Sequence, residues 1–174
     1  KRGEPYFNHC LDTAQNLDNW HLDETTIAAG LLHDTVEDTG VPLGTIKKIF
    51  GEDIAFLVGG VTKLGKIKYR GAHVQIENLR KMILAISEDV RVVFIKLADR
   101  LHNMQTLSAL PSLKQKRIAL ETDEIYAPLA YRLGMQHVSG ELQDLAFPYL
   151  YPKEYTWLME AVKEHYQERL TYLN

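Results

Sequence analysis

The 174-residue sequence predicts an all-α fold packed as a single compact domain, and three observations support this. Apolar residues recur at helical spacing nearly throughout, and no sustained alternation of apolar and polar residues between hairpin turns indicates a strand. A content of 45% hydrophobic and 25% charged residues is typical of a globular protein. A chain of this length buries a core without cross-links, and its single cysteine, Cys10, cannot form an internal disulfide.

The first part of the chain carries the signals of four helices. Asp23 is a candidate N-cap for the second helix, which carries the segment LLHDTVEDT and ends at the turn TGVPLG. In the fourth helix, Gly59 and Gly60 predict close packing or a bend, because glycine is a poor helix former. The first, third and fourth helices are expected at about residues 7–19, 43–50 and 52–64.

The rest of the chain is expected to be helical apart from one basic loop, GKIKYRGAHVQ, which we expect to be mobile. The nearly continuous apolar run RVVFIKLA predicts a central, buried helix. Pro128 predicts a kink in a later helix, and FPYLYP is expected to separate an amphipathic helix from a final polar one. These helices are expected at about 74–87, 90–104, shortly after Pro111, at 124–133, and from Ser139 to about Tyr172.

Composition excludes several classes of function. No apolar run approaches the roughly 20 residues that span a bilayer, and the opening KRGEP lacks the hydrophobic segment of a secretory signal. We therefore expect a cytoplasmic protein with no membrane partner. The net charge of −3 argues against bulk binding of nucleic acid. A small anionic ligand needs only a local basic patch, and the residues that supply one are Lys63, Lys66, Lys68 and Arg70.

The segment LLHDTVEDT holds four side chains that bind metals or handle protons: His33, Asp34, Glu37 and Asp38. Residues four apart share a face of a helix, so His33 would lie beside Glu37 and Asp34 beside Asp38. This pattern predicts a metal site with its own acid–base pair. The alternative is an acidic face exposed to solvent.

Two distant positions supply further ligands. Asp99 emerges from the apolar run on the same helical face as His102 and Asn103, and burying its carboxylate is costly unless it is paired or bound to a metal. A salt bridge or a capping role is the alternative for Asp99, and a lone histidine such as His9 is most often an ordinary residue. Together with His33 and Asp34, which we call the HD dyad, His9 and Asp99 form a set of two histidines and two carboxylates. Such a set suits manganese, iron or zinc.

The motifs also resemble a known family. In order, GEPY, a histidine, HDTVEDT, GVTKL, ENLRKM and IKLADRLHNM resemble the hydrolase domain of the RelA/SpoT homologue family, over nearly the whole chain. That family belongs to the HD phosphohydrolase superfamily, so the resemblance implies a single compact helical HD-domain phosphohydrolase fold. It implies a hydrolase domain at 1–150 and a helical extension at 151–174 that leads to a further domain, possibly a C-terminal synthetase, in a longer protein.

The resemblance implies an activity: hydrolysis of the 3′-pyrophosphate of the alarmones (p)ppGpp to GDP or GTP plus pyrophosphate, in the stringent response. The alternatives are an HD phosphohydrolase acting on another nucleotide, and a catalytically silent nucleotide-sensing module.

It also implies roles for individual residues. One divalent metal, usually Mn²⁺, would be held by His9, His33, Asp34 and Asp99, and Glu37 and Asp38 would manage the attacking water. The residues implied or proposed to bind the nucleotide are Lys1, Arg2, Lys63, Lys66, Asn103 and Thr106. The chain departs from the family at Gln105, where an arginine is common, and at Cys10, which replaces a proline. The family also has an arginine just before the lysine-rich approach to GEPY, a position that precedes Lys1, and Arg2 is a possible substitute for it.

Overall fold

The computed structural model describes the backbone of residues 6–65 and 88–172, and the side chains of residues 6–64 and 88–163. All regular secondary structure in these residues is helical, which confirms the all-α prediction. Contacts divide the chain into two compact units, Lys1–Ala109 and Leu110–Asn174. The division expected from the sequence, 1–150 and 151–174, is a different one and stays a prediction.

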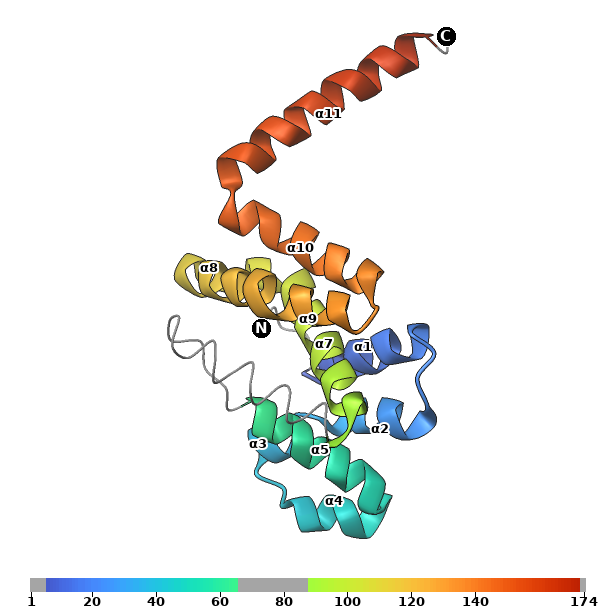
Figure 1. Ribbon diagram of the computed structural model, residues 1–174. Helices are drawn as coiled ribbons and strands as arrows, with labels where there is room; N and C mark the ends of the chain where they lie inside the picture. Colours follow the sequence, from blue (N-terminus) through green and yellow to red (C-terminus); the bar gives the residue numbers. More distant parts are fainter. Residues whose placement is uncertain (1–5, 66–87, 173–174) are drawn as a thin grey trace. The chain divides into compact units, whose positions relative to one another are not determined.

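The first unit is built around one buried helix, as the apolar run RVVFIKLA predicts. This helix, α7, packs against α1, α2 and α5, while α4 and the short α3 pack against α5 (Figure 1). Its buried positions include Val92, Ile95 and Leu97. The unit comprises α1 (Phe7–Asn19), α2 (Glu24–Leu32), α3 (Thr35–Thr39), α4 (Leu43–Phe50), α5 (Glu52–Gly65), α7 (Val90–Gln105) and the 3₁₀ turn η1 (Leu107–Ala109).

The helices α1 and α2 approach closely because α2 carries a glycine at the contact. A Cβ placed on Gly30 would lie 2.4 Å from Cδ1 of Leu17, a side chain that is fully buried. The start of α2 is fixed by its predicted cap, since the Asp23 side chain accepts a hydrogen bond from the Thr26 amide at 3.1 Å. The close contact and the cap thereby fix the position of α2 relative to α1.

The paired glycines of α5 mark close packing, and the helix runs through them without a break. A Cβ on Gly59 would lie 2.9 Å from Cδ2 of Leu43, and one on Gly60 would lie 2.7 Å from Cγ2 of Val92. Of the two predicted explanations, close packing is therefore confirmed.

The segment LLHDTVEDT does not lie in one uninterrupted helix, which differs from the expectation. The helix α2 ends at Leu32, α3 begins at Thr35, and His33 and Asp34 form the turn between them. Asp34, at φ −91° and ψ −5°, precedes the first residue of α3 as its N-terminal flanking residue. As a result, the HD dyad and the acidic pair belong to different elements.

The second unit differs from its prediction at both of its inner prolines. Instead of a kinked helix at 124–133, a π-helical turn joins α8 to α9, and the Ala127 amide donates to the Thr122 carbonyl, five residues back. Pro128 then falls at the start of α9, where its missing amide costs little. Pro148 lies inside α10, so the expected break begins only at Tyr151. The elements are α8 (Ser112–Glu121), η2 (Thr122–Tyr126), α9 (Ala127–Arg132), α10 (Gln136–Leu150) and α11 (Pro152–Tyr172).

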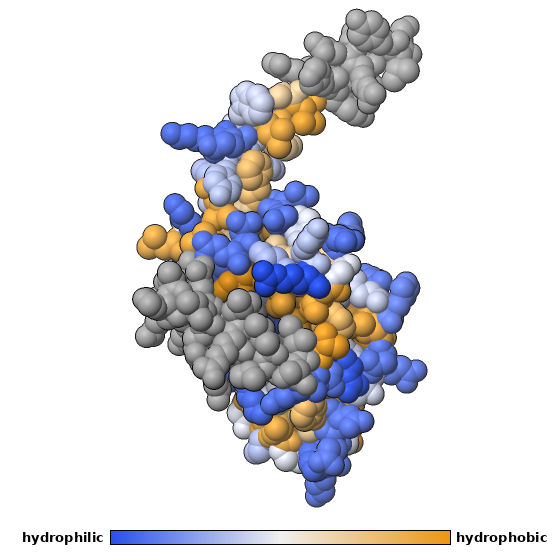
Figure 2. Space-filling view, in the orientation of Figure 1, coloured by the Kyte–Doolittle hydropathy of each residue, from blue (hydrophilic) through white to orange (hydrophobic). Residues whose placement is uncertain are grey.

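Two sequence predictions, the basic loop after Gly65 and the helix at 74–87, lie outside the described residues. Among the helices that are described, none has both the length and the apolar character needed to cross a bilayer. Figure 2 shows hydrophilic and hydrophobic residues interspersed on the visible face. The exposed apolar side chains of α11 include Trp157 and Val162.

Candidate metal centre

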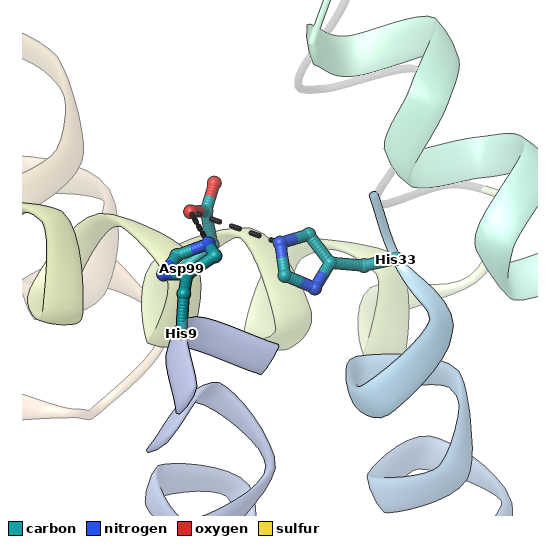
Figure 3. Close-up of side chains that lie close together, drawn as sticks. All are labelled: His9, His33 and Asp99. Atoms are coloured by element: carbon teal, nitrogen blue, oxygen red, sulfur yellow. Dashed lines mark ion pairs between the residues drawn. The ribbon is translucent and has the colours of Figure 1, made fainter. Parts of the chain in front are cut away.

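Side chains from three helices of the first unit converge on one point (Figure 3). His9 comes from the first turn of α1, His33 from the end of α2, and Asp99 from the middle of α7. One ligand atom from each of these three residues lies within 4.8 Å of the other two. The structure thus brings together residues that are up to 90 positions apart in the sequence.

Three of the four distances between these side chains match the spacing of ligands that share one metal ion, and the fourth is longer. Nε2 of His9 lies 3.3 Å from Oδ1 of Asp99 and 3.4 Å from Oδ2 of Asp34. Nε2 of His33 lies 3.1 Å from Oδ2 of Asp34 and 3.8 Å from Oδ1 of Asp99. Metal bonds of about 2.1 Å place two ligand atoms about 3.0–3.4 Å apart in octahedral or tetrahedral geometry. Asp34 contacts both histidines, although it lies outside the three-residue cluster, and its role as a fourth ligand stays a prediction.

His33 is oriented for metal binding by the backbone of its own helix. Its Nδ1 lies 2.7 Å from the Gly30 carbonyl oxygen, which can only accept, so Nδ1 carries a proton and, in the neutral ring that binds a metal, Nε2 carries a lone pair. Nε2 is buried and has no hydrogen-bond partner, because its contact with Asp34 lacks hydrogen-bond geometry. A buried acceptor without a partner is costly unless a ligand fills the site, so the residues present fit a metal.

Both oxygens of the buried Asp99 carboxylate are held. Lys96 donates to Oδ2 at 2.6 Å, and the side-chain amide of Asn103 donates to Oδ1. Burial opposes ionisation, but the Lys96 ammonium and the two histidines outweigh it and keep the pKa of Asp99 well below its usual range. The predicted shared face of Asp99 and Asn103 is confirmed, and the carboxylate stays charged.

Electrostatics at the centre favour a cation. Burial lowers the pKa of His9, but Asp34 and Asp99 outweigh this effect and raise it to about 9. In the same way burial opposes ionisation of Asp34, and its close contacts with His33 and His9 hold its pKa well below the ordinary value. In the absence of a metal, protons on the histidines thus balance the two carboxylates.

His9 is oriented by side chains rather than by the backbone. Its Nδ1 lies 2.6 Å from Nδ1 of His102, whose Nε2 lies 3.1 Å from Oδ2 of Asp12. Burial and the charge of His9 lower the pKa of His102. The sequence placed His102 on the face of Asp99, but it gave no sign of this contact with α1.

Tyr6 is a second candidate for a role at the centre that the sequence analysis did not identify. Its hydroxyl donates to Oδ2 of Asp34 at 2.5 Å and also faces Asp38. Burial and these two carboxylates raise the pKa of Tyr6, so the phenol stays protonated and remains a donor. The signal available in the sequence was the motif GEPY, in which this tyrosine lies three residues before His9.

The predicted acid–base pair lies on α3, immediately after the dyad. Glu37 and Asp38 are both exposed, and the Asp38 amide donates to the Asp34 carbonyl at 2.9 Å. Partial burial raises the pKa of Glu37, an effect that Lys96 partly opposes. A carboxylate with a raised pKa is a better proton acceptor than an ordinary one.

The predicted nucleotide contacts are only partly described. Lys63 is exposed near the end of α5, and the Asn103 side chain donates to Asp99. Thr106 is exposed at the end of α7, where its hydroxyl donates to the His102 carbonyl at 3.0 Å. The other three, Lys1, Arg2 and Lys66, lie outside the described residues.

Comparison with known proteins agrees with this geometry. The family model described as an HD domain matches residues 1–136. This chain belongs to the HD domain family. Its histidine–aspartate dyad, His33 and Asp34, lies at the centre described above.

Curated relatives share about half of the residues of this HD domain chain. One is the guanosine-3′,5′-bis(diphosphate) 3′-pyrophosphohydrolase of Aquifex aeolicus, 52% identical over 99% of this chain and 25% of the relative. Another is the GTP pyrophosphokinase of Streptomyces coelicolor, 50% identical over 99% of this chain and 20% of the relative. The chain thus spans a quarter or less of the length of these relatives.

Solved structures share the fold. A structure described as a metazoan ortholog of SpoT that hydrolyzes ppGpp has a TM-score of 0.54 and 25% identity, covering 85% of this chain and 81% of its own. A protein of Listeria monocytogenes has a TM-score of 0.51 and 24% identity, covering 81% of this chain and 99% of its own. The second likeness concerns the fold alone.

Proposed function

We propose that this chain hydrolyses the 3′-pyrophosphate of (p)ppGpp, yielding GDP or GTP and pyrophosphate, in alarmone turnover of the stringent response. The observation that carries the proposal is the cluster of His9, His33 and Asp99, with Asp34 in contact with both histidines and Glu37 and Asp38 on the next helix. The substrate is proposed from the 52% identity to a relative named for this activity.

The ligands in this proposal are His9, His33, Asp34 and Asp99, and the metal is Mn²⁺. A bound divalent ion would lower the pKa of a water molecule and polarise a phosphate oxygen. The mixed nitrogen and oxygen donors, without a thiolate, suit manganese. The lone pair on Nε2 of His33 and the charged state of Asp99 support the assignment.

Glu37 or Asp38 accepts the proton of the attacking water. The water oxygen forms a bond to the phosphorus next to the ribose, the bond from that phosphorus to O3′ breaks, and O3′ takes up a proton. Pyrophosphate leaves with the new oxygen. A positioned acid–base group of this kind contributes about 10²–10⁴-fold to the rate, and the raised pKa of Glu37 makes it the stronger base candidate.

Basic and polar groups around the centre would hold the nucleotide. In this proposal Asn103 and Thr106 contact the guanosine, and positive charges neutralise the phosphates. The proposed basic residues are Lys1, Arg2, Lys63 and Lys66. Because the curated relatives are at least four times longer than the matched region, we also propose that the chain works in a longer cytoplasmic protein with a C-terminal synthetase domain.

The test is release of pyrophosphate from ppGpp by the purified chain, measured with Mn²⁺ and with a chelator. We expect release only with metal, and none from Asp34→Ala. An Mn²⁺-loaded, folded protein that releases no pyrophosphate would overturn the proposal.

A second variant separates water handling from metal binding. Glu37→Gln should keep Mn²⁺ binding and lose most of the turnover, because the amide cannot accept the proton. Glu141→Gln, on α10 in the other unit, is the matched control and should behave as the parent. Full turnover by Glu37→Gln would instead indicate that Asp38 is the base.

A silent nucleotide-sensing module is a second candidate, favoured by one observation. A relative that is 50% identical over 99% of this chain is named for pyrophosphate transfer to GTP, not for hydrolysis. A sensor would bind ppGpp without turnover. A panel of other nucleotides, in the same assay, tests the remaining alternative of a different phosphohydrolase.

A further inference from the structure

A chain of three side chains leads from the surface of the first unit to the metal centre. Asp12 is 54% exposed on α1, the His102 side chain on α7 is 14% exposed, and that of His9 is 13% exposed. The contacts run from Oδ2 of Asp12 to Nε2 of His102 at 3.1 Å, and from Nδ1 of His102 to Nδ1 of His9 at 2.6 Å. Nε2 of His9, at the inner end, faces Asp34 and Asp99.

The Asp12 carboxylate determines which nitrogen carries the proton in the neutral rings of His102 and His9. A carboxylate only accepts, so His102 presents N–H at Nε2 and, as a neutral ring, a lone pair at Nδ1. Two ring nitrogens 2.6 Å apart need one donor and one acceptor, so Nδ1 of His9 carries the proton. In the neutral ring, Nε2 of His9 is then left with a lone pair directed into the centre.

We infer that Asp12 and His102 are positioning residues, which set the tautomer and ring orientation of His9 so that its Nε2 binds the metal. This inference rests on the proposed metal centre. The two histidine ligands are therefore oriented in different ways. His33 relies on the Gly30 carbonyl of its own helix, whereas His9 relies on a side chain from α7 and a carboxylate open to solvent.

The test is the dissociation constant for Mn²⁺ alone, measured without substrate by electron paramagnetic resonance. Loss of such an outer partner typically weakens metal binding by about 10–100-fold, and we expect this for His102→Leu. His102→Asn, whose amide oxygen takes the place of Nδ1 as acceptor, should restore binding to within about threefold. A structural role for His102 would not predict this rescue.

Asp12 acts through His102, so its effect depends on the histidine. Asp12→Ala should weaken Mn²⁺ binding by less than His102→Leu does, and adding it to His102→Leu should cause no further loss. The matched controls are Asp18→Ala, at another exposed site on α1, and His137→Leu on α10. Both should bind Mn²⁺ as the parent does.

Several results would overturn the inference: parental Mn²⁺ affinity in His102→Leu, no rescue by asparagine, or full additivity with Asp12→Ala. Nitrogen-15 spectra of the zinc-loaded parent protein give a test that needs no variant, since His102 must carry its proton on Nε2 and His9 on Nδ1. The opposite tautomers would refute it. A parent chain that binds no metal would instead contradict the proposed function itself.

Discussion

Gly30→Ala tests whether the close approach of α1 and α2 builds the metal centre. The added Cβ would lie 2.4 Å from Cδ1 of Leu17, whereas carbon atoms in contact lie about 3.5–4.0 Å apart, so the fully buried Leu17 side chain or one of the helices must shift by about 1 Å. Overpacking of this severity falls in the upper part of the usual range, about 2–3 kcal/mol. Alanine recovers about 1 kcal/mol through its helix propensity, which leaves a net loss of about 1–2 kcal/mol in the free energy of unfolding.

The same shift should reach the site, because Gly30 also accepts the hydrogen bond that orients His33. We expect weaker Mn²⁺ binding together with the loss of stability, measured by Mn²⁺ titration and urea unfolding of one preparation. Gly59→Ala is the matched control, since its Cβ meets only the end of the half-exposed Leu43 side chain, away from the site. It should be neutral or stabilising by up to about 1 kcal/mol. Parental stability and Mn²⁺ affinity in Gly30→Ala would refute the reasoning.

Two further predictions concern pH and helix capping. The pKa of His9, about 9, lies above its unfolded value of about 6.5, so the stability that its protonation gives the metal-free protein is present below pH 6.5 and lost as the pH rises to 9. Mn²⁺ competes with that proton, so the apparent affinity for Mn²⁺ should instead rise by up to about tenfold per pH unit towards pH 9. Calorimetry checks the trend in stability and Mn²⁺ titration the trend in affinity. A flat profile in either measurement would contradict the corresponding prediction. Arg91 contacts Asp23 and Asp89, the N-caps of α2 and α7. Arg91→Ala should lower the free energy of unfolding by about 0.5–1 kcal/mol, less in high salt, and a loss as large at 1 M salt would argue against an ionic origin.

Helix positions were predictable where a local signal decides them. The helix from Phe7 to Asn19 and the Asp23 cap follow from apolar spacing and capping chemistry alone, and the structure confirms both. The π-helical turn before Pro128 and the helix that continues through Pro148 were not predictable in this way. Packing among α8, α9 and α10 decides them, and tertiary packing overrides local preference.

The candidate site was likewise predictable from the sequence only in part. Ligand types and their order along the chain suggested His9, His33 and Asp99, and the structure brings these three together. The contacts of His102 with His9 and of Tyr6 with Asp34 join residues 93 and 28 positions apart. Spacing along a single helix carries no information about contacts of this kind, because they depend on how helices cross.

His33 and Asp34 lie between α2 and α3 rather than inside either helix. Nε2 of His33 and Oδ2 of Asp34 lie 3.1 Å apart, so two consecutive residues bring a nitrogen and an oxygen to one point. The His33 ring is anchored to the end of α2 through the Gly30 carbonyl, and the Asp34 carbonyl accepts from the Asp38 amide of α3. A designer who grafts the motif must therefore transplant the ends of both helices along with the two side chains.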